Sequence, residues 1–396
     1  MTSRPHLVSR RRFLAWSGAL AAAASTGGAE LAFADAPSPA HYDKLLVLIE
    51  LKGGNDGFNT LVPFADPGYA EARPKLAIAR DAVVQLSDRA GLHPALAPLN
   101  ALWKNNELAV LQGVGYSDPN LSHFRSIEIW DTASKSQEYL QQGWLTRTFA
   151  ATPTPATFAA DGVIVGSNDM GPLAGGGTRA LALADPARFM QRAKLVHAAA
   201  SRGNKALQHV LKTEADIVQA ASRLDSEHAF TTLFPATAFG NAIRTACRVV
   251  ASRASVAAVR VTLGGFDTHA AQAPTQARLL RELAEGVAAL RAALGEIDRW
   301  NSTLALTYAE FGRRPQENQS AGTDHGTANV HFAMGGRVQG GMYGETASLA
   351  NLSPNANVAH AIDFRSVYAT ILERWWTVDS RAVLGGRFAP LPFLVT

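Results

Sequence analysis

Nearly continuous hydrophobic runs alternate along this chain with segments whose hydrophobic positions recur every three or four residues. The run at residues 45–51 is almost wholly apolar and ends at Lys52-Gly53-Gly54, which is typical of a strand buried on both faces. The same reasoning predicts further strands at residues 108–114, 163–165, 256–263, 304–307 and 330–338. Helical periodicity predicts helices at residues 94–105, 122–132, 241–251, 276–300 and 364–375.

Alternating strands and helices indicate an α/β fold, in which a doubly wound, mainly parallel sheet carries helices on both faces. Residues from about 171 to 235 break this pattern, because Gly175-Gly176-Gly177 is followed by helical, charged sequence. We therefore predict a single domain over residues 35–396. It should contain a helical insertion at about 171–235 that packs near the edge of the sheet and adds no central strand.

The N-terminus predicts export of the folded protein across a bacterial inner membrane by the twin-arginine route. Ser9-Arg10-Arg11-Arg12-Phe13-Leu14 precedes a short alanine-rich stretch, and Ala32-Phe33-Ala34 then offers the small-x-small pattern that signal peptidase accepts. We expect residues 1–34 to be a cleaved signal peptide, read by the twin-arginine translocase and by signal peptidase. The mature protein should be periplasmic or secreted.

Composition narrows the classes of function. The formal net charge of +4 falls to +1 without residues 1–34, and no basic stripe with interleaved aromatics follows, so we expect no nucleic-acid partner. Cys247 is the only cysteine, which excludes an intrachain disulfide and a zinc site built from cysteines. No other apolar run reaches the ~18 residues of a membrane helix, so we expect no stable membrane anchor.

Polar clusters follow four of the predicted strands. They are Gly53-Gly54-Asn55-Asp56-Gly57, Asn120-Leu121-Ser122-His123-Phe124, Gly264-Gly265-Phe266-Asp267-Thr268-His269, and Glu310-Phe311-Gly312-Arg313 with Thr323-Asp324-His325-Gly326. Ligands of open α/β sheets bind beyond the carboxyl ends of the strands, so we expect these clusters to converge. Carboxylates and imidazoles without cysteine suit a divalent metal such as zinc, manganese or magnesium.

Each cluster also has a purely structural interpretation. Asp56 could form a turn, Ser122 and Asp267 could cap helices, and Asp324-His325 could join a hydrogen-bonded loop. The position that all four clusters share, at the ends of predicted strands, favours the functional interpretation.

The motifs G-G-N-D-G-F-N-T-L-V-P, S-H-F, G-G-F-D-T-H and A-E-F-G-R followed by D-H-G resemble the exported family called domain of unknown function 1501. The resemblance runs from about Lys44 to the C-terminal helix. That family is similar to the alkaline phosphatase and sulfatase superfamily, whose doubly wound α/β sheet holds one or two metals.

The resemblance implies roles for individual side chains. The implied metal-ligating residues are Asp56, Asp267, His269, Glu310, Asp324 and His325. Ser122, at the start of a helix, takes the place of the nucleophile, and Ser126, one turn further on, is its rival. Arg125 or Arg313 would bind the nonbridging oxygens of the substrate.

One departure from the superfamily pattern keeps two functions open. Where the superfamily places Asp-His, this chain has Glu310-Phe311, and phenylalanine cannot bind a metal. The leading hypothesis is a metal-dependent hydrolase that acts on a small phosphate or sulfate ester and holds one ion, or none. The alternative is a non-catalytic periplasmic protein that uses a degenerate alkaline phosphatase-like cleft for binding or envelope assembly.

Overall fold

The first strand shows how both faces of the sheet are covered. β1 (Leu45–Lys52) is buried except at Lys52. Leu45, Val47, Ile49 and Leu51 belong to one hydrophobic cluster, whereas Leu46 and Leu48 belong to another. Because successive side chains of a strand point to opposite faces, β1 has a hydrophobic core on each side. The computed structural model of the chain describes residues 40–184, 228–252, 255–349, 352–353 and 355–395.

Nine of the described strands form the main sheet, in the order β13-β5-β12-β9-β1-β8-β6-β7, with β14 also paired to β5. Their bounds are β5 (Leu108–Gly115), β6 (Gly162–Val165), β7 (Ala180–Leu183), β8 (Ala258–Gly264), β9 (Thr303–Tyr308), β12 (Asn329–Met334), β13 (Gly341–Gly344) and β14 (Ile362–Asp363). Every pairing is parallel except those of β12, which runs antiparallel to β5 and β9. The strands β1, β5, β8 and β9 therefore end at one edge of the sheet.

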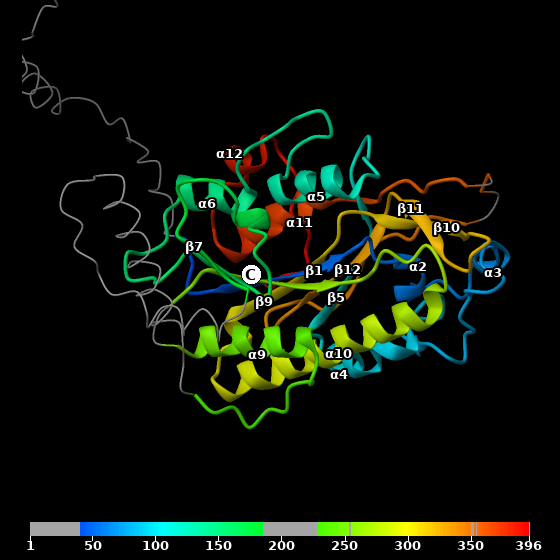
Figure 1. Cartoon of the computed structure of the whole chain (residues 1–396), viewed down its shortest axis with the longest axis horizontal. Coiled ribbons are helices and arrows are strands. Elements are labelled where there is room, and N and C mark those ends of the chain that lie inside the picture. Colours follow the sequence, from blue (N-terminus) through cyan, green and yellow to red (C-terminus); the bar gives the residue numbers. More distant parts are fainter. Residues whose placement is uncertain (1–39, 185–227, 253–254, 350–351, 354, 396) are drawn as a thin grey trace, which may run out of the picture. The chain divides into compact units, whose positions relative to one another are not determined.

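Helices cover both faces of this sheet (Figure 1). On one face lie α4 (Asn100–Lys104), α9 (Ala238–Ala251) and α10 (Gln272–Glu296), whose buried residues share a cluster with the odd-numbered residues of β1. On the other face lie α5 (His123–Thr132), α6 (Trp144–Ala151), α11 (Phe364–Thr370) and α12 (Ser380–Leu384), which pack with Leu46 and Leu48. The predicted doubly wound, mainly parallel α/β fold is confirmed.

Smaller elements surround the edge where β1, β5, β8 and β9 end. α2 (Gly57–Thr60) follows β1 directly, and α3 (Pro67–Ala72) comes next. A second sheet joins β2 (Leu61–Val62), β4 (Gly91–Leu92) and β3 (Val84–Gln85). After β9 comes an antiparallel hairpin of β10 (Gly312–Glu317) and β11 (Thr323–Gly326). The sequence patterns predict none of these short elements, because none is long enough to show a period.

The boundaries of several predicted elements differ in the structure. The helix predicted at residues 94–105 is a 3₁₀ helix, η1 (Pro94–Leu99), followed by α4, because Pro98 inside it has no N–H to donate and interrupts regular α-helical hydrogen bonding. The predicted helix at 364–375 is α11 followed by the π-helical turn η4 (Ile371–Trp375). Two 3₁₀ turns, η2 (Gly171–Leu173) and η3 (Trp300–Ser302), precede β7 and β9.

Two predictions concern segments that are wholly or partly outside the described residues. The proposed signal peptide at 1–34 lies outside them, as do residues 185–227 of the predicted helical insertion. The described part of that insertion contributes β7, an edge strand parallel to β6, where we expected helical structure. None of the helices in the described segments is long and apolar enough to cross a bilayer.

Candidate metal centre

Three segments that follow strands of the main sheet meet at the edge where those strands end. Asp267 and His269 lie just after β8, and His123 opens α5 after β5. His325 lies on β11, in the hairpin that follows β9. The topology thus brings one carboxylate and three imidazoles together from distant parts of the chain.

The carboxylate of Asp267 lies at the middle of this group. Its Oδ1 is 3.1 Å from Nε2 of His269 and 3.2 Å from Nε2 of His325, and its Oδ2 is 3.4 Å from Nε2 of His123. The ligand atoms of His123, Asp267 and His325 all lie within 4.8 Å of one another. The two Nε2 atoms of His269 and His325 are 3.0 Å apart. We call His123, Asp267, His269 and His325 the His₃Asp cluster.

Each imidazole of the His₃Asp cluster is held from behind through its other nitrogen. Nδ1 of His123 is 2.8 Å from Oε1 of Glu310, and Nδ1 of His269 is 3.1 Å from Oδ1 of Asp324. Nδ1 of His325 is 2.8 Å from the carbonyl oxygen of Leu121. Carbonyl and carboxylate oxygens only accept hydrogen bonds, so we infer that each Nδ1 carries the proton and each Nε2 keeps a lone pair.

This tautomer pattern fits a metal ion. Unprotonated Nε2 atoms of His269 and His325, only 3.0 Å apart, repel each other unless a cation lies between them. Nε2 of His123 is shielded from solvent and has no hydrogen-bond partner. An outer oxygen behind each ligating histidine is also the usual arrangement in protein metal sites. The residues present therefore suit a divalent cation.

The pKa values of Asp267 and His325 favour the protonation states that can bind a metal ion. Partial burial raises the pKa of Asp267, but the hydrogen bond and positive charge of Arg313 outweigh this and hold the pKa below its usual range. Burial lowers the pKa of His325, although its contacts with Leu121 and Asp267 oppose the shift. Near neutral pH the carboxylate of Asp267 is therefore charged and the imidazole of His325 is neutral.

Two residues predicted as metal ligands lie behind the cluster. Oε1 of Glu310 accepts hydrogen bonds from His123 and from the backbone N–H of Gly53, at 2.8 and 2.9 Å. Asp324 is similarly bonded to His269 and to the amide of Asn318. The structure thus places Glu310 and Asp324 against the Nδ1 atoms of His123 and His269, and their role as ligands stays a prediction.

Asp56 departs furthest from its predicted role. Its carboxylate is fully buried and receives both terminal nitrogens of the Arg73 guanidinium, at 2.5 and 3.0 Å. Gln272 and the backbone N–H of Phe58 donate to the same two oxygens. Asp56 is therefore the N-cap of α2 and half of a buried ion pair. With both oxygens already occupied, it is not a ligand of the His₃Asp cluster.

Arg125 and Arg313, the two arginines predicted to bind the substrate, bind other groups of the chain in the structure. Arg313 is fully buried and donates to the carbonyl oxygens of Gly54 and Thr323 at 2.8 Å, and to Oδ1 of Asp267 at 2.7 Å. Arg125 donates to backbone carbonyls of residues 135, 136 and 138 and lies 3.9 Å from the ring centre of Tyr139. Arg313 orients Asp267, and Arg125 holds the loop after α5, so neither guanidinium is free for a substrate.

The two candidate nucleophiles differ sharply in access. Ser122 is exposed at the N-cap of α5, and its hydroxyl makes no capping hydrogen bond. Ser126 is fully buried, lies 2.9 Å from the hydroxyl of Tyr116 and donates to the carbonyl oxygen of Glu310. Only Ser122 of this pair could meet a substrate.

Phe311 closes one side of the cluster with an apolar wall. Its buried ring lies 4.9 Å from the ring of His123 and 4.3 Å from that of His325. Gly54 has a φ of +76°, and a Cβ there would come within 2.4 Å of the Phe311 ring. Gly53, at φ +116°, packs equally closely on the backbone of Asp267. The double glycine after β1 is therefore required for the loops to approach each other.

Sequence reasoning missed His123 as a candidate ligand. The S-H-F motif predicts a role for Ser122 and none for His123. The available signal was the position of His123 beside Ser122 at the end of a buried strand, where the other polar clusters also lie.

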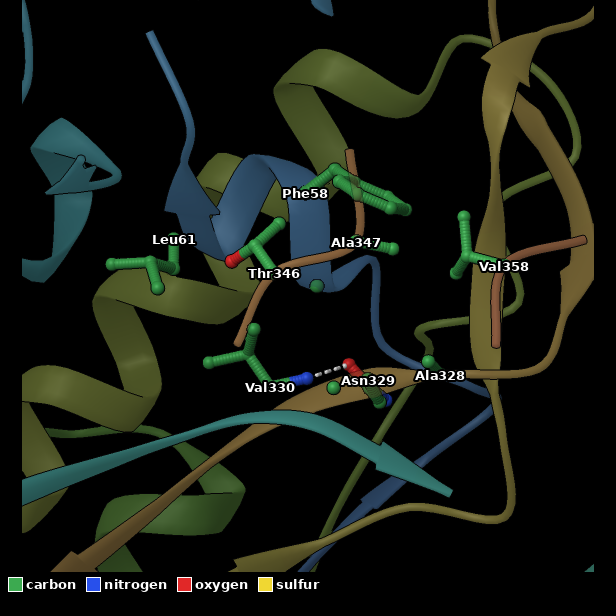
Figure 2. A pocket seen from close by; sticks show the side chains of 10 residues that line it. Phe58, Leu61, Ala328, Asn329, Val330, Thr346, Ala347 and Val358 are labelled. Carbon is green, nitrogen blue, oxygen red and sulfur yellow. Dashed lines mark hydrogen bonds between the residues drawn. The ribbon is translucent and has the colours of Figure 1, made fainter. Parts of the chain in front are cut away.

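A separate hollow lies between α2, β12 and the residues Thr346, Ala347 and Val358 (Figure 2). Phe58, Leu61, Val330 and Val358 line it, and Oδ1 of Asn329 accepts from the backbone N–H of Val330 beside it. None of its lining residues has a titratable side chain, so it offers neither a metal ligand nor an acid or base.

Comparisons with known proteins place the chain in a family. The family model described as "Protein of unknown function (DUF1501)" matches residues 108–386. No curated protein matches the chain significantly.

Several solved structures are similar in fold, all at low identity. The zinc complex of the C-terminal periplasmic domain of EcEptC from Escherichia coli is 10% identical, with a TM-score of 0.38 and coverage of 76% of this chain and 77% of that one. The phosphonate monoester hydrolase of Agrobacterium radiobacter is 9% identical, with a TM-score of 0.35 and coverage of 88% and 78%. A protein in the alkaline phosphatase superfamily from Vibrio parahaemolyticus is 8% identical, with a TM-score of 0.40 and coverage of 89% and 70%. At these values nothing about the activity of this chain follows.

Proposed function

This chain belongs to the DUF1501 family of proteins of unknown function, and we propose that it is an exported, metal-dependent hydrolase of phosphate or sulfate esters. The His₃Asp cluster would hold the ion, and Ser122 would be the nucleophile. Glu310, Asp324 and Arg313 would keep the ligands in place.

The placement of Ser122 is the observation that carries this proposal. The residue before it, Leu121, accepts a hydrogen bond from His325, and the residue after it, His123, belongs to the cluster. Ser122 is therefore fixed on both sides to the candidate metal centre, while its own hydroxyl is exposed and does not cap α5. A serine that served only as a helix cap would direct its oxygen at the backbone of the first turn.

The donor set favours zinc or a similar late transition metal over magnesium. Three imidazole nitrogens and one carboxylate match zinc preferences, whereas magnesium prefers six oxygen ligands. A bound ion would polarise the ester and lower the pKa of a nearby hydroxyl. The lost Asp56 ligand and the apolar Phe311 favour a single ion.

The chain's own groups would perform the transfer in two stages. Oγ of Ser122 would form the new bond to phosphorus or sulfur while the ester's alcohol leaves, and the serine proton would pass to solvent. Water would then hydrolyse the ester on Ser122 and restore the hydroxyl. The N-terminal backbone N–H groups of α5 lie beside Ser122 and would stabilise negative charge on the transferred group.

Phe311 is the specific feature that supports the rival function. Its ring occupies the side of the cluster where the superfamily resemblance implies a further ligand. A protein that only binds an anion or a partner at this cleft would keep the His₃Asp cluster and show no turnover.

One set of variants separates these two functions. Metal-loaded protein would be assayed with aryl phosphate and aryl sulfate, beside Ser122→Ala and the metal-site variant His325→Ala. We expect Ser122→Ala to lose hydrolysis to the level of His325→Ala, yet to keep its metal and to change unfolding free energy by less than about 0.5 kcal/mol. Ser117→Ala, at an exposed serine before α5, is the matched control. If the parent protein hydrolyses neither ester above the His325→Ala background, the binding function replaces the enzyme.

A further inference from the structure

We infer that Lys52 is the side chain that binds the nonbridging oxygens of the anionic substrate, in the place that the sequence suggested for Arg125 or Arg313. This inference rests on the proposed function for its substrate class. Its central claim, that the metal centre and Lys52 together bind an anion, can also be tested by anion binding alone, without measuring hydrolysis.

The register of β1 places Lys52 on the face where α5 begins. Leu46 and Leu48 pack on the α5 side of the sheet, and Glu50, two residues further along β1, binds Arg260 and Thr262. Lys52 is the next residue on that side and ends the strand. It is exposed, and Gly53, which follows it, binds Glu310 of the candidate metal centre.

Space beside Lys52 is open. Its register partner on β8 is Gly264, where an added Cβ would meet no atom within 4 Å. The carbonyl oxygen of Lys52 accepts from the backbone N–H of Phe266, the residue before Asp267. A small anion over Gly264 would therefore lie between the Lys52 stem and the loop that carries Asp267.

Lys52 and Glu310 both influence the pKa of Glu50, which places their charges in the same region. Burial raises the pKa of Glu50, the positive charges of Arg260 and Lys52 oppose that rise, and Glu310 adds to it. Lys52 and Glu310 thus both lie near enough to Glu50 to influence its carboxylate. This is the side of the sheet that carries Ser122 and His123.

Charge balance explains why a further cation is needed. Asp267, Asp324 and Glu310 place three carboxylates at the centre, against the buried guanidinium of Arg313 and the charge of Arg314, which lowers the pKa of Asp324. A divalent ion offsets most of the remaining negative charge, and an anionic ester adds more, so a further cation favours its binding. Among the described residues the Lys52 ammonium has no ion pair, and it is an exposed cation on the α5 side of the sheet that could supply further positive charge.

The test uses anion binding and turnover together. Metal-loaded full-length protein, Lys52→Met and Lys52→Arg would be titrated with inorganic phosphate and sulfate and assayed with aryl phosphate and aryl sulfate. Lys104→Met is the matched control, because Lys104 is an exposed lysine before β5, at the opposite edge of the sheet. Metal content and melting temperature are measured for every variant.

We expect Lys52→Met to weaken phosphate binding and lower kcat/KM by about 10- to 100-fold, the loss of one charge-assisted hydrogen bond. Lys52→Arg should recover most of both, and Lys104→Met should match the parent. Unchanged phosphate binding by Lys52→Met, or no anion binding by the metal-loaded parent, would overturn the inference. If the parent binds phosphate but hydrolyses neither ester, and Lys52→Met loses the phosphate binding, this inference stands and only the proposed hydrolase function is wrong.

Discussion

Oε1 of Glu310 lies 2.8 Å from Nδ1 of His123, and the backbone N–H of Gly53 donates to the same oxygen. Glu310 is buried, so its carboxylate holds His123 through a bond that water does not weaken. Because Glu310 contacts the proposed ligand His123, changing Glu310 should alter metal affinity while His123 itself is kept.

We therefore expect Glu310→Gln to lower zinc affinity by about 10- to 100-fold, since partners behind metal-ligating histidines typically have effects of this size. Competition with a chromogenic chelator would measure the affinity. Glu285→Gln, at an exposed position of α10, is the matched control and should bind zinc like the parent. Parent-like affinity in Glu310→Gln would show that His123 does not depend on Glu310.

Asp56→Asn should affect stability and not metal content. The change leaves Arg73 charged and buried without its carboxylate, and breaking a buried pair in this way costs about 3–5 kcal/mol of unfolding free energy. Urea unfolding measures that loss, and elemental analysis of the folded fraction measures the metal. Arg73→Met should give a similar loss by removing the other partner. Folded Asp56→Asn without metal would return Asp56 to the ligand set.

Acid should destabilise the metal-free protein through two buried histidines. Burial lowers the pKa of His331, on β12, to about 3 and that of His93, before η1, to about 4. Both folded pKa values lie below the unfolded value of about 6.5, so the unfolded state takes up protons first as pH falls. The associated stability is complete above about pH 6.5. It declines below that by up to about 1.4 kcal/mol per pH unit for each histidine.

Urea unfolding at pH 7, 6 and 5 with a chelator present checks this slope without interference from metal loss. His331→Phe removes one of the two groups and keeps an aromatic ring against Trp130, so its stability should depend less steeply on pH. An equal slope in parent and variant would mean that His331 becomes protonated in the folded state.

Export should depend on the arginine pair near the N-terminus. Replacing Arg10 and Arg11 by lysine should leave uncleaved precursor in the cytoplasm, because the twin-arginine receptor reads the pair as an address. Cell fractionation followed by mass measurement of the N-terminus distinguishes precursor from a product that begins at Asp35. Normal cleavage and export of the double-lysine protein would argue for another route.

The sequence predicted the fold well because its strands are long and apolar on both faces. The strands β1, β5, β8 and β9 each read as hydrophobic runs, and the polar residues that follow them had to meet at one edge. That reasoning also brought Asp267, His269 and His325 together, although their role as ligands remains a prediction.

Which partner each polar side chain contacts could not be predicted in the same way. Whether a carboxylate faces an ion or an arginine depends on tertiary contacts, and nothing local marks Arg73 as the partner of Asp56. Glu310 and Asp324 are predicted as ligands from the sequence, because a carboxylate that contacts a histidine from behind has the same sequence signature as one that binds metal. His123 was passed over because a neighbouring serine offered a more familiar role.

Arg313 has a consequence for the order in which the molecule folds. Its guanidinium joins the carbonyl oxygen of Gly53, 260 residues earlier in the chain, to Phe266 and Thr323. Closing so large a loop is slow, and it gains contact energy only once β1, β8 and the β10–β11 hairpin have docked. The His₃Asp cluster therefore needs the same long-range pairings as the central sheet, and a chain in which β1, β8 and the β10–β11 hairpin are still apart offers no assembled site to a metal. We therefore expect an ion to bind this centre only after these long-range contacts have formed, in whichever compartment that happens.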